Sequence, residues 1–448
     1  MQNNIQKVEK FSQSITWKGI IIGIMTLLLL IPGAMIESLI FERQQRSIET
    51  IQKINEKWSN AQTVNGPFLV IPYQIKTIDV KKNVSIEKFN FYLAPEVLKI
   101  NAKLTPEERH YGIYKSILYK SDLDIAGNFK NPMPFLPSNA EVNWSDVHVR
   151  IGITDLRGIS NNMNFSLNGV SASAEAGGTQ DAIGQGLVIL LKNSESLLAG
   201  KGTAFNCKLK LNGSADINFV PAGKTTQVQM HGLWKSPGFI GSFTPEYTLN
   251  DTSFTAKWNV LHFNRNIPEY WTDNEVKSIA DTSFGVNLVD TVDHYQQNMR
   301  SAKYSLMFIA LTFVVFFFVE IITRKRIHPI QYLLVGIALI LFYSLLLSIS
   351  EQLNFASAYL IASLATIALI VVYAHSIFRN KTQTGILASI LALLYIFLYV
   401  VLQLEDIALL IGSIGLFVIL GIIMYVSRKI SWYKPTETEN SNTENNIS

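Results

Sequence analysis

Six long apolar runs stand out when hydrophobic and polar positions are followed along the chain. The first begins after Lys18, reaches Glu37 without a charge and continues to Phe41, and five more follow near the C-terminus. A helix needs about 20 residues to cross the hydrocarbon of a bilayer, and backbone groups in lipid must pair within the segment. We therefore predict six membrane-spanning helices, the last five forming a region at 304–427: 17–41, 304–322, 330–349, 355–378, 384–402 and 407–426.

A secretory signal peptide is the alternative for the first run. Its apolar region would span about 7–15 residues and end at a small-residue cleavage site. The first run is longer than that, and no A-x-A pattern follows it. We therefore expect a retained membrane anchor.

Basic residues occupy the N-terminal flank, every second connection and the C-terminal flank, whereas the connections 351–354 and 403–406 carry acids instead. Positive flanks stay in the cytoplasm, so we predict that 1–16 and 428–448 are cytoplasmic and that 42–303 lies on the far side of the membrane. The polar segment Pro435–Ser448 predicts a disordered tail. The basic residues are Lys7, Lys10, Lys18, Arg324, Lys325, Arg326, Arg379, Lys381, Arg428, Lys429 and Lys434.

The insertion at 42–303 has the pattern of a water-soluble domain. Ile48, Ile51, Ile54 and Trp58 recur at helical spacing, which predicts a short membrane-proximal helix packed on the domain. Beyond Gly66 the period changes to two. Apolar and polar residues alternate most clearly at 89–93, 147–153, 207–219 and 254–260.

Many short alternating segments separated by turns are typical of an antiparallel all-β sandwich or a curved sheet. Asn212-Gly213 predicts a hairpin turn, because these residues tolerate positive φ. The small, polar segment Ser171–Gly186 predicts a mobile loop. The predicted fold class is an α-helical six-span membrane protein with an inserted all-β, sandwich-like domain.

Composition and charge indicate which kinds of molecule the protein binds. Charged residues make up 16% of the chain, below the roughly 25% of an average domain, because 304–427 is almost free of charge. The net charge of +4 is too small to indicate a nucleic-acid partner. Cys207, the single cysteine, excludes an internal disulfide. The lipid bilayer is the expected partner, and the sequence sets no oligomeric state.

The chain offers little catalytic or metal-binding chemistry. Its seven histidines are scattered, without an H-E-x-x-H motif, a Cys–His cluster or a G-x-S-x-G motif, so we expect no metal, no cofactor and no enzymatic activity. Glu320 lies four residues before Arg324, which predicts a structural ion pair on one helix face, with a transport site as the alternative. His328-Pro329 predicts the turn into the third span, with a proton relay as the alternative.

Four stretches of the chain resemble the CreD family, also called the cell envelope integrity protein family. The similarity is dense after Phe284 and thin in the middle of the inserted domain. The stretches are GPFLVIPY at 66–73, FGVNLVDTVDHYQQNMRSAKYSLMFIALTFVVFFFVE at 284–320, RIHPIQYLLVGIALILFYSLLLSISE at 326–351 and QLEDIALL at 403–410.

The resemblance implies an inner-membrane protein of the Gram-negative envelope, so the far side predicted for the inserted domain would be the periplasm. It also implies a role in envelope integrity and, in some relatives, in envelope stress and β-lactam responses. The family supplies no established catalytic residues. The candidate positions are motif residues at the domain–membrane junction and at the ends of spans: Asp293, His294, Tyr295, Lys303, Glu320, Arg324, His328, Pro329, Gln331 and Tyr332.

Three functions follow as hypotheses. The first is a non-enzymatic envelope protein whose external domain binds an envelope protein or a lipid ligand. The second is a transporter or lipid-handling protein that uses the helices and a hydrophobic cavity in the β domain. The third, an envelope enzyme, requires that residues such as His231, His262 or acidic neighbours converge in one pocket.

Overall fold

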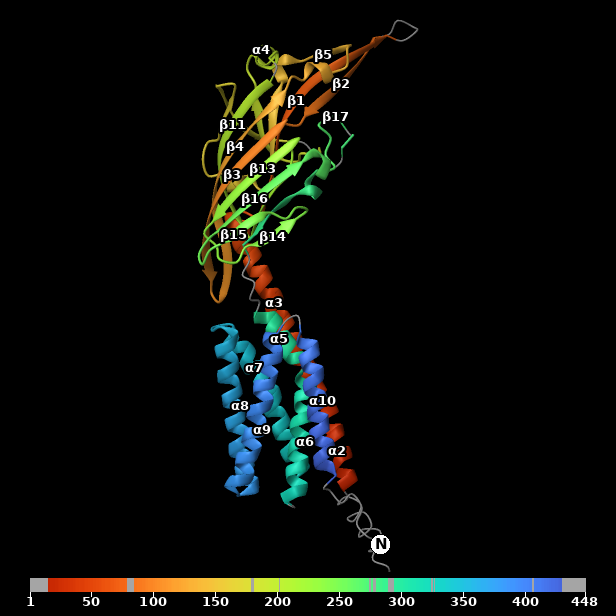
Figure 1. The fold of residues 1–448 in the computed structure, drawn as a ribbon, viewed down its shortest axis with the longest axis vertical. Coiled ribbons are helices and arrows are strands. Elements are labelled where there is room, and N and C mark those ends of the chain that lie inside the picture. Colours follow the sequence, from red (N-terminus) through yellow and green to blue (C-terminus); the bar gives the residue numbers. More distant parts are fainter. Residues whose placement is uncertain are drawn as a thin grey trace, which may run out of the picture. The chain divides into compact units, whose positions relative to one another are not determined.

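The chain divides into two compact units. One combines Met1–Arg46 with Asp293–Ser448 and is called the helical unit here; the other, Ser47–Val292, is called the β unit. Figure 1 shows the helices of the first and the strands of the second. The computed structural model describes residues 15–78, 84–178, 181–200, 202–273, 275–276, 279–288, 294–323, 325, 327–404 and 407–428.

The helical unit confirms the predicted number of spans. Six helices of the described residues are long and apolar enough to cross a membrane, when α2 and α3 are counted together from Trp17 to Trp58. α3 continues past Arg46 into the β unit. The helices are α2 (Ile15–Leu28), α3 (Leu30–Trp58), α5 (His294–Lys303), α6 (Ser305–Thr323), α7 (Pro329–Ser350), α8 (Phe355–Phe378), α9 (Lys381–Gln403) and α10 (Ala408–Ser427).

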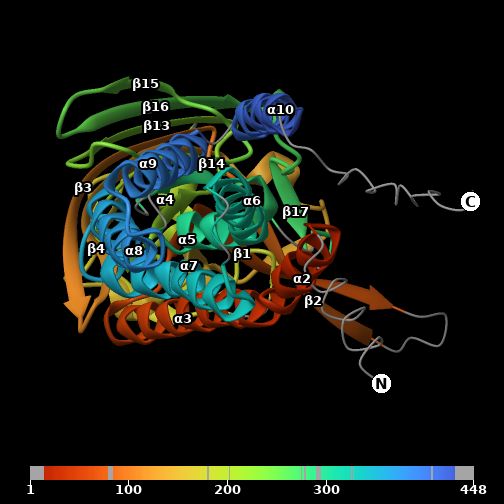
Figure 2. The ribbon, with the colours of Figure 1, turned by 90° about the horizontal axis from the view of Figure 1, so that it is seen from below.

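The spans pack around one apolar core. α7 packs on α8, α8 on α9, and α6 on both α7 and α9, while α2 contacts α6 and α7 (Figure 2). Phe308, Phe313, Phe342 and Leu398 are fully or almost fully buried in this core. Asn354 and Asn380 begin α8 and α9, because their side chains accept hydrogen bonds from first-turn backbone N–H groups.

The β unit contains two sheets in its described residues. The first has the order β14-β18-β12-β1-β6-β10-β9, with β2 and β5 also paired to β1 and β17 to β2. Its strands are β14 (Gly238–Gly241), β18 (Phe284–Asn287), β12 (Asp216–Phe219), β1 (Gln62–Ile78), β6 (His148–Ile153), β10 (Gly186–Leu190), β9 (Glu175–Gly177), β2 (Val84–Leu93), β5 (Ala140–Val142) and β17 (Tyr270–Thr272).

The second sheet has the order β15-β16-β13-β3-β4-β11-β7-β8. Its strands are β15 (Glu246–Leu249), β16 (Phe254–Leu261), β13 (Thr225–Gly232), β3 (Val97–Tyr111), β4 (Tyr114–Lys130), β11 (Gly202–Ser214), β7 (Asn164–Leu167) and β8 (Val170–Ser173). The short helices are α4 (Ser194–Leu198) and the 3-10 turns η1 (Met133–Phe135), η2 (Trp144–Asp146), η3 (Leu156–Gly158), η4 (His262–Asn264) and η5 (Ala280–Thr282).

The two sheets share one hydrophobic core, so the predicted all-β, sandwich-like domain is confirmed. In β11 burial alternates with exposure, as the sequence pattern required. Phe68, Phe129, Ile151 and Phe284 come from both sheets and are fully buried. The pairing is not wholly antiparallel: β1 pairs with β12 and β3 with β13 in parallel.

The predicted hairpin at Asn212-Gly213 is wrong. Both residues lie within β11, where Gly213 pairs with Tyr119 of β4. A Cβ at Gly213 would lie 2.2 Å from the Tyr119 hydroxyl oxygen, so glycine permits a close approach here and not a turn. The positive φ of 57° falls at Ala215. The chain crosses there to the other sheet, where β12 pairs with β1 and β18.

The predicted membrane-proximal helix and the predicted loop at Ser171–Gly186 differ in part from the structure. The predicted membrane-proximal helix exists as the end of α3, but Ile48 is half exposed and only the last turns pack on the β unit. There the Ser116 hydroxyl donates to Asn55, and Arg109 lies over the Trp58 ring at 5.2 Å. The segment predicted as a mobile loop, Ser171–Gly186, contributes to β8, β9 and the start of β10 in its described part.

Candidate functional site

Glu320 is the centre of a buried polar cluster in the helical unit. It lies near the end of α6, and its side chain is 7% exposed. Its Oε2 accepts a hydrogen bond of 2.9 Å from the Tyr332 hydroxyl, and its Oε1 accepts one of 3.1 Å from the Ile327 backbone N–H. Lys18 of α2 forms an ion pair with the same carboxylate. The cluster therefore joins α2, α6 and α7.

The turn between α6 and α7 brings these groups together. Pro329 occupies the first turn of α7, where its missing N–H costs nothing. The His328 ring nitrogen accepts from the Ile330 N–H, and the Gln331 side chain accepts from the His328 N–H. This cap fixes the first turn of α7, and Tyr332 lies on it.

Aromatic contacts hold the Tyr332 ring in place. It meets Phe313 edge-on at 5.7 Å and Phe316 at 6.2 Å between ring centroids. A charge at mid-bilayer costs about 2.5–3.5 kcal/mol on insertion scales. Three donors and a position near a helix end offset that cost for Glu320. The arrangement stabilises three helices and uses both carboxylate oxygens.

A second cluster surrounds Glu351, which caps the other end of α7. Its Oε1 accepts a hydrogen bond of 3.2 Å from the Tyr295 hydroxyl, and the Arg43 guanidinium lies 4.0 Å from Oε2. Beside it, the Asn298 amide donates to the Ser350 hydroxyl at 2.7 Å. The short helix α5 is thereby attached to the end of α7.

The structure joins some of the predicted site residues and separates others. Glu320 and Tyr332 share one cluster, with His328, Pro329 and Gln331 in the adjoining cap; His294 and Tyr295 begin α5 in the other cluster. Lys303 is exposed at the end of α5. Asp293 and Arg324, with the predicted Glu320–Arg324 pair, lie outside the described residues.

Sequence reasoning missed the cationic partners. Lys18 counted only as a flanking charge, and Arg43 was not singled out. Lys18 lies 302 positions from Glu320, so no local spacing links them. The signal was the charge pattern itself: an N-terminal cation and Glu320 fall at the same predicted end of the membrane-spanning region.

The β unit has a carboxylate cluster of its own. Asp155 accepts from the Asn60 N–H at 3.0 Å and from the Arg157 guanidinium at 2.7 Å. The Arg157 hydrogen bond, followed by the backbone donors, lowers the pKa of Asp155 to about 2. The cluster attaches the segment after α3 to η3, far along the sequence.

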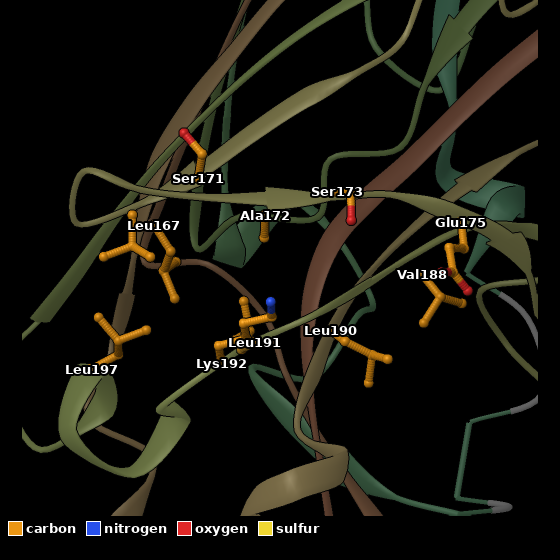
Figure 3. A pocket seen from close by; sticks show the side chains of 11 residues that line it. Leu167, Ser171, Ala172, Ser173, Glu175, Val188, Leu190, Leu191, Lys192 and Leu197 are labelled. Atoms are coloured by element: carbon orange, nitrogen blue, oxygen red, sulfur yellow. The ribbon is translucent and has the colours of Figure 1, made fainter.

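A groove opens at one margin of the β unit, between β8 of one sheet and β10 of the other. Its volume is about 340 Å³. Leu190 and Leu191 lie beneath Ala172 and Ser173, with Glu175 toward one side (Figure 3). β8 is the last strand of its sheet in the described residues, so its outer edge has no strand partner there.

His231 and His262 of the β unit lie apart. His231 pairs with Thr255 near one end of the β13–β16 ladder, and its ring contacts the Thr255 hydroxyl. His262 follows Leu261, which pairs with Thr225 at the opposite end. Six ladder positions at about 3.3 Å each separate the two ends. Among the described residues, no three His, Cys, Asp or Glu side chains are grouped to hold a metal ion.

The sequence matches to known proteins cover nearly the whole chain. Residues 14–433 match the family model described as inner membrane protein CreD. Inner membrane protein CreD of Escherichia coli (strain K12) is 31% identical over 422 residues. The aligned region covers 93% of this chain and 93% of that protein, so both units are included.

Proposed function

Because this chain belongs to the CreD family of inner membrane proteins, we propose that it supports the integrity of the bacterial envelope as a non-enzymatic binding protein. The helical unit anchors the protein in the inner membrane. The β unit faces the periplasm and binds an extended segment of an envelope protein.

The distribution of basic residues supports this orientation. Lys18 pairs with Glu320, and Lys325 donates to the Phe378 carbonyl, so basic residues from distant parts of the sequence gather at one end of the helical unit. Positive charge is retained on the cytoplasmic side. Residues 351–354, at the opposite end of α7, then face the periplasm together with the β unit.

The groove beside β8 is the observation that carries the binding role. Its edge strand presents backbone donors and acceptors to an incoming strand, and leucines line the floor below. Addition of a strand to a free edge is a common mode of peptide recognition. Glu175 and Lys192 at the rim supply one charge of each sign, which would favour a polar peptide with alternating apolar residues.

The interior of the β unit supports this role over lipid handling. Side chains of both sheets fill the shared core, from Phe68 and Ile71 of β1 to Leu209 of β11. A transported lipid would need a continuous hydrophobic cavity.

Complementation with matched groove variants tests the proposal. Leu190 beside β8 and Leu249 of β15 are both exposed leucines on β-strands, at 53% and 50%. We expect the wild-type chain and Leu249→Lys to restore dye exclusion in cells that lack the gene, and Leu190→Lys to fail at equal membrane abundance. Full restoration by Leu190→Lys, or equal failure of both variants, contradicts a role for the groove.

A further inference from the structure

A second groove lies between the end of α8 and the start of α9, apart from both carboxylate clusters. It has a volume of about 400 Å³. We propose that it binds an anionic phospholipid, with the phosphate at its polar end and an acyl chain along its apolar walls. Val371, Val372, Gly385 and Ala388 form the walls, and His375, Lys381 and Thr384 form the polar end.

Small residues on α9 leave space between the apolar walls of the groove. Gly385 and Ala388 face the two valines of α8 across the groove. A Cβ added at Gly385 would meet nothing within 4 Å, so the space there is open. Val372 beside it is 71% exposed and Ile386 is 53% exposed. In a bilayer such a face contacts lipid, and the groove gives one acyl chain additional walls.

Hydrogen bonds fix the position of two side chains at the polar end of the groove. The Thr384 hydroxyl donates its single hydrogen to the Asn380 carbonyl at 2.9 Å. Its oxygen therefore accepts from His375 Nδ1, 3.3 Å away. This assigns the Nδ1 proton to the hydrogen bond with Thr384 and leaves Nε2 as the ring nitrogen available to a ligand. The ring is held between the two helices.

Cations select the charge of the ligand. Lys381 is exposed at the first position of α9, and Arg379 is exposed at the cap of α8. A basic pocket between membrane-spanning helices, continuous with an apolar surface, matches an anionic lipid headgroup and its chain. The charge complementarity and the lipid-facing walls favour a phospholipid over a protein segment.

Native mass spectrometry of the purified full chain tests this site. We expect a phosphatidylglycerol adduct that survives removal of bulk detergent, and a weaker adduct with zwitterionic phosphatidylethanolamine. Lys381→Gln should reduce occupancy by phosphatidylglycerol about fivefold, the effect of one lysine near an anionic phosphate. Gly385→Leu places an apolar side chain in the groove, at a position where a Cβ meets nothing within 4 Å. It should reduce occupancy to the level of the zwitterionic lipid.

Two control variants match these changes in chemistry. Gly421→Leu adds the same side chain at another open helical glycine, and Arg428→Gln removes another exposed cation; neither residue lines the groove. Both should keep the wild-type adduct. Thermal unfolding in the same detergent identifies variants with native stability, and Ala388→Leu, on the same wall, replaces Gly385→Leu if that variant does not fold.

Three results would overturn the site. The first is equal occupancy by phosphatidylglycerol and phosphatidylethanolamine. The second is displacement of the lipid by millimolar inorganic phosphate, which would identify a site for free phosphate. The third is an unchanged adduct in folded Lys381→Gln or Gly385→Leu.

Discussion

Each end of the helical unit contains a largely buried carboxylate, and the two carboxylates differ in how many close partners stabilise them. At each end a carboxylate lies near the C-terminus of a helix, where the helix dipole disfavours negative charge. Glu320 and Glu351 each meet a tyrosine hydroxyl and a cation, which comes from α2 for Glu320 and from α3 for Glu351. Glu320 adds a backbone donor, whereas Glu351 is 4.0 Å from its arginine.

The difference shows that the number of close donors distinguishes these clusters better than burial does. The two carboxylate side chains are similarly covered, at 7% and 10% exposed. The cations differ more: Lys18 is 27% exposed and Arg43 is 40% exposed. A partner that water can solvate contributes less. We infer that the Glu320 cluster holds the helices together and that the Glu351 cluster positions α5.

Removal of each carboxylate is the strongest test of this comparison. Glu320→Ala leaves a buried tyrosine hydroxyl, a backbone N–H and a lysine without their acceptor, so the free energy of unfolding should fall by about 3 kcal/mol. Glu351→Ala should lower it by about 1 kcal/mol. Equilibrium unfolding in mixed micelles measures both. Equal losses would show that the two clusters are equivalent.

Asp155 extends the comparison to the β unit, where pH can test it. Its pKa is about 2 against an ordinary 3.8, so the folded state favours the ionised form. That stabilisation, about 2 kcal/mol, is present above pH 4 and is lost as pH falls from about 4 to 2. We expect the difference in unfolding midpoint between wild type and Asp155→Asn to shrink over that range. A difference that stays constant down to pH 2 would refute this assignment.

The tyrosines give a smaller and more local test. Tyr332→Phe keeps the ring contacts with Phe313 and Phe316 and deletes one hydrogen bond to a charged group, so it should cost about 1.5 kcal/mol. Tyr295→Phe deletes a longer bond and should cost about 0.5 kcal/mol. The same micelle titration measures both. A larger loss for Tyr295→Phe would reverse the ranking of the two ends.

The spans and the β domain could be predicted because their causes are local. Each apolar run is stable in lipid as a helix independently of the rest of the fold, and the alternation of side chains along a strand is visible within a few residues. The clusters depend instead on pairing across the fold. Lys18 and Glu320 are brought together by helix packing, which no spacing encodes. The prediction of a turn at Asn212-Gly213 was wrong for the same reason. Gly213 remains paired in β11, and the chain crosses to the other sheet at Ala215.

The central claim is that the basic end of the helical unit and the β unit face opposite sides of the membrane. Native Cys207 is buried in β11, and burial raises its pKa to about 12. It should therefore not react with an impermeant maleimide, and the unsubstituted chain is the control. Single cysteines can be introduced at three exposed positions: Val84, Gln352 and Thr382.

Labelling of these three variants in spheroplasts is the most direct measurement. We predict that Val84→Cys and Gln352→Cys react from outside, and that Thr382→Cys reacts only after the inner membrane is opened. Reaction of Thr382→Cys in sealed spheroplasts, or protection of Val84→Cys until lysis, would contradict the orientation and the periplasmic role built on it.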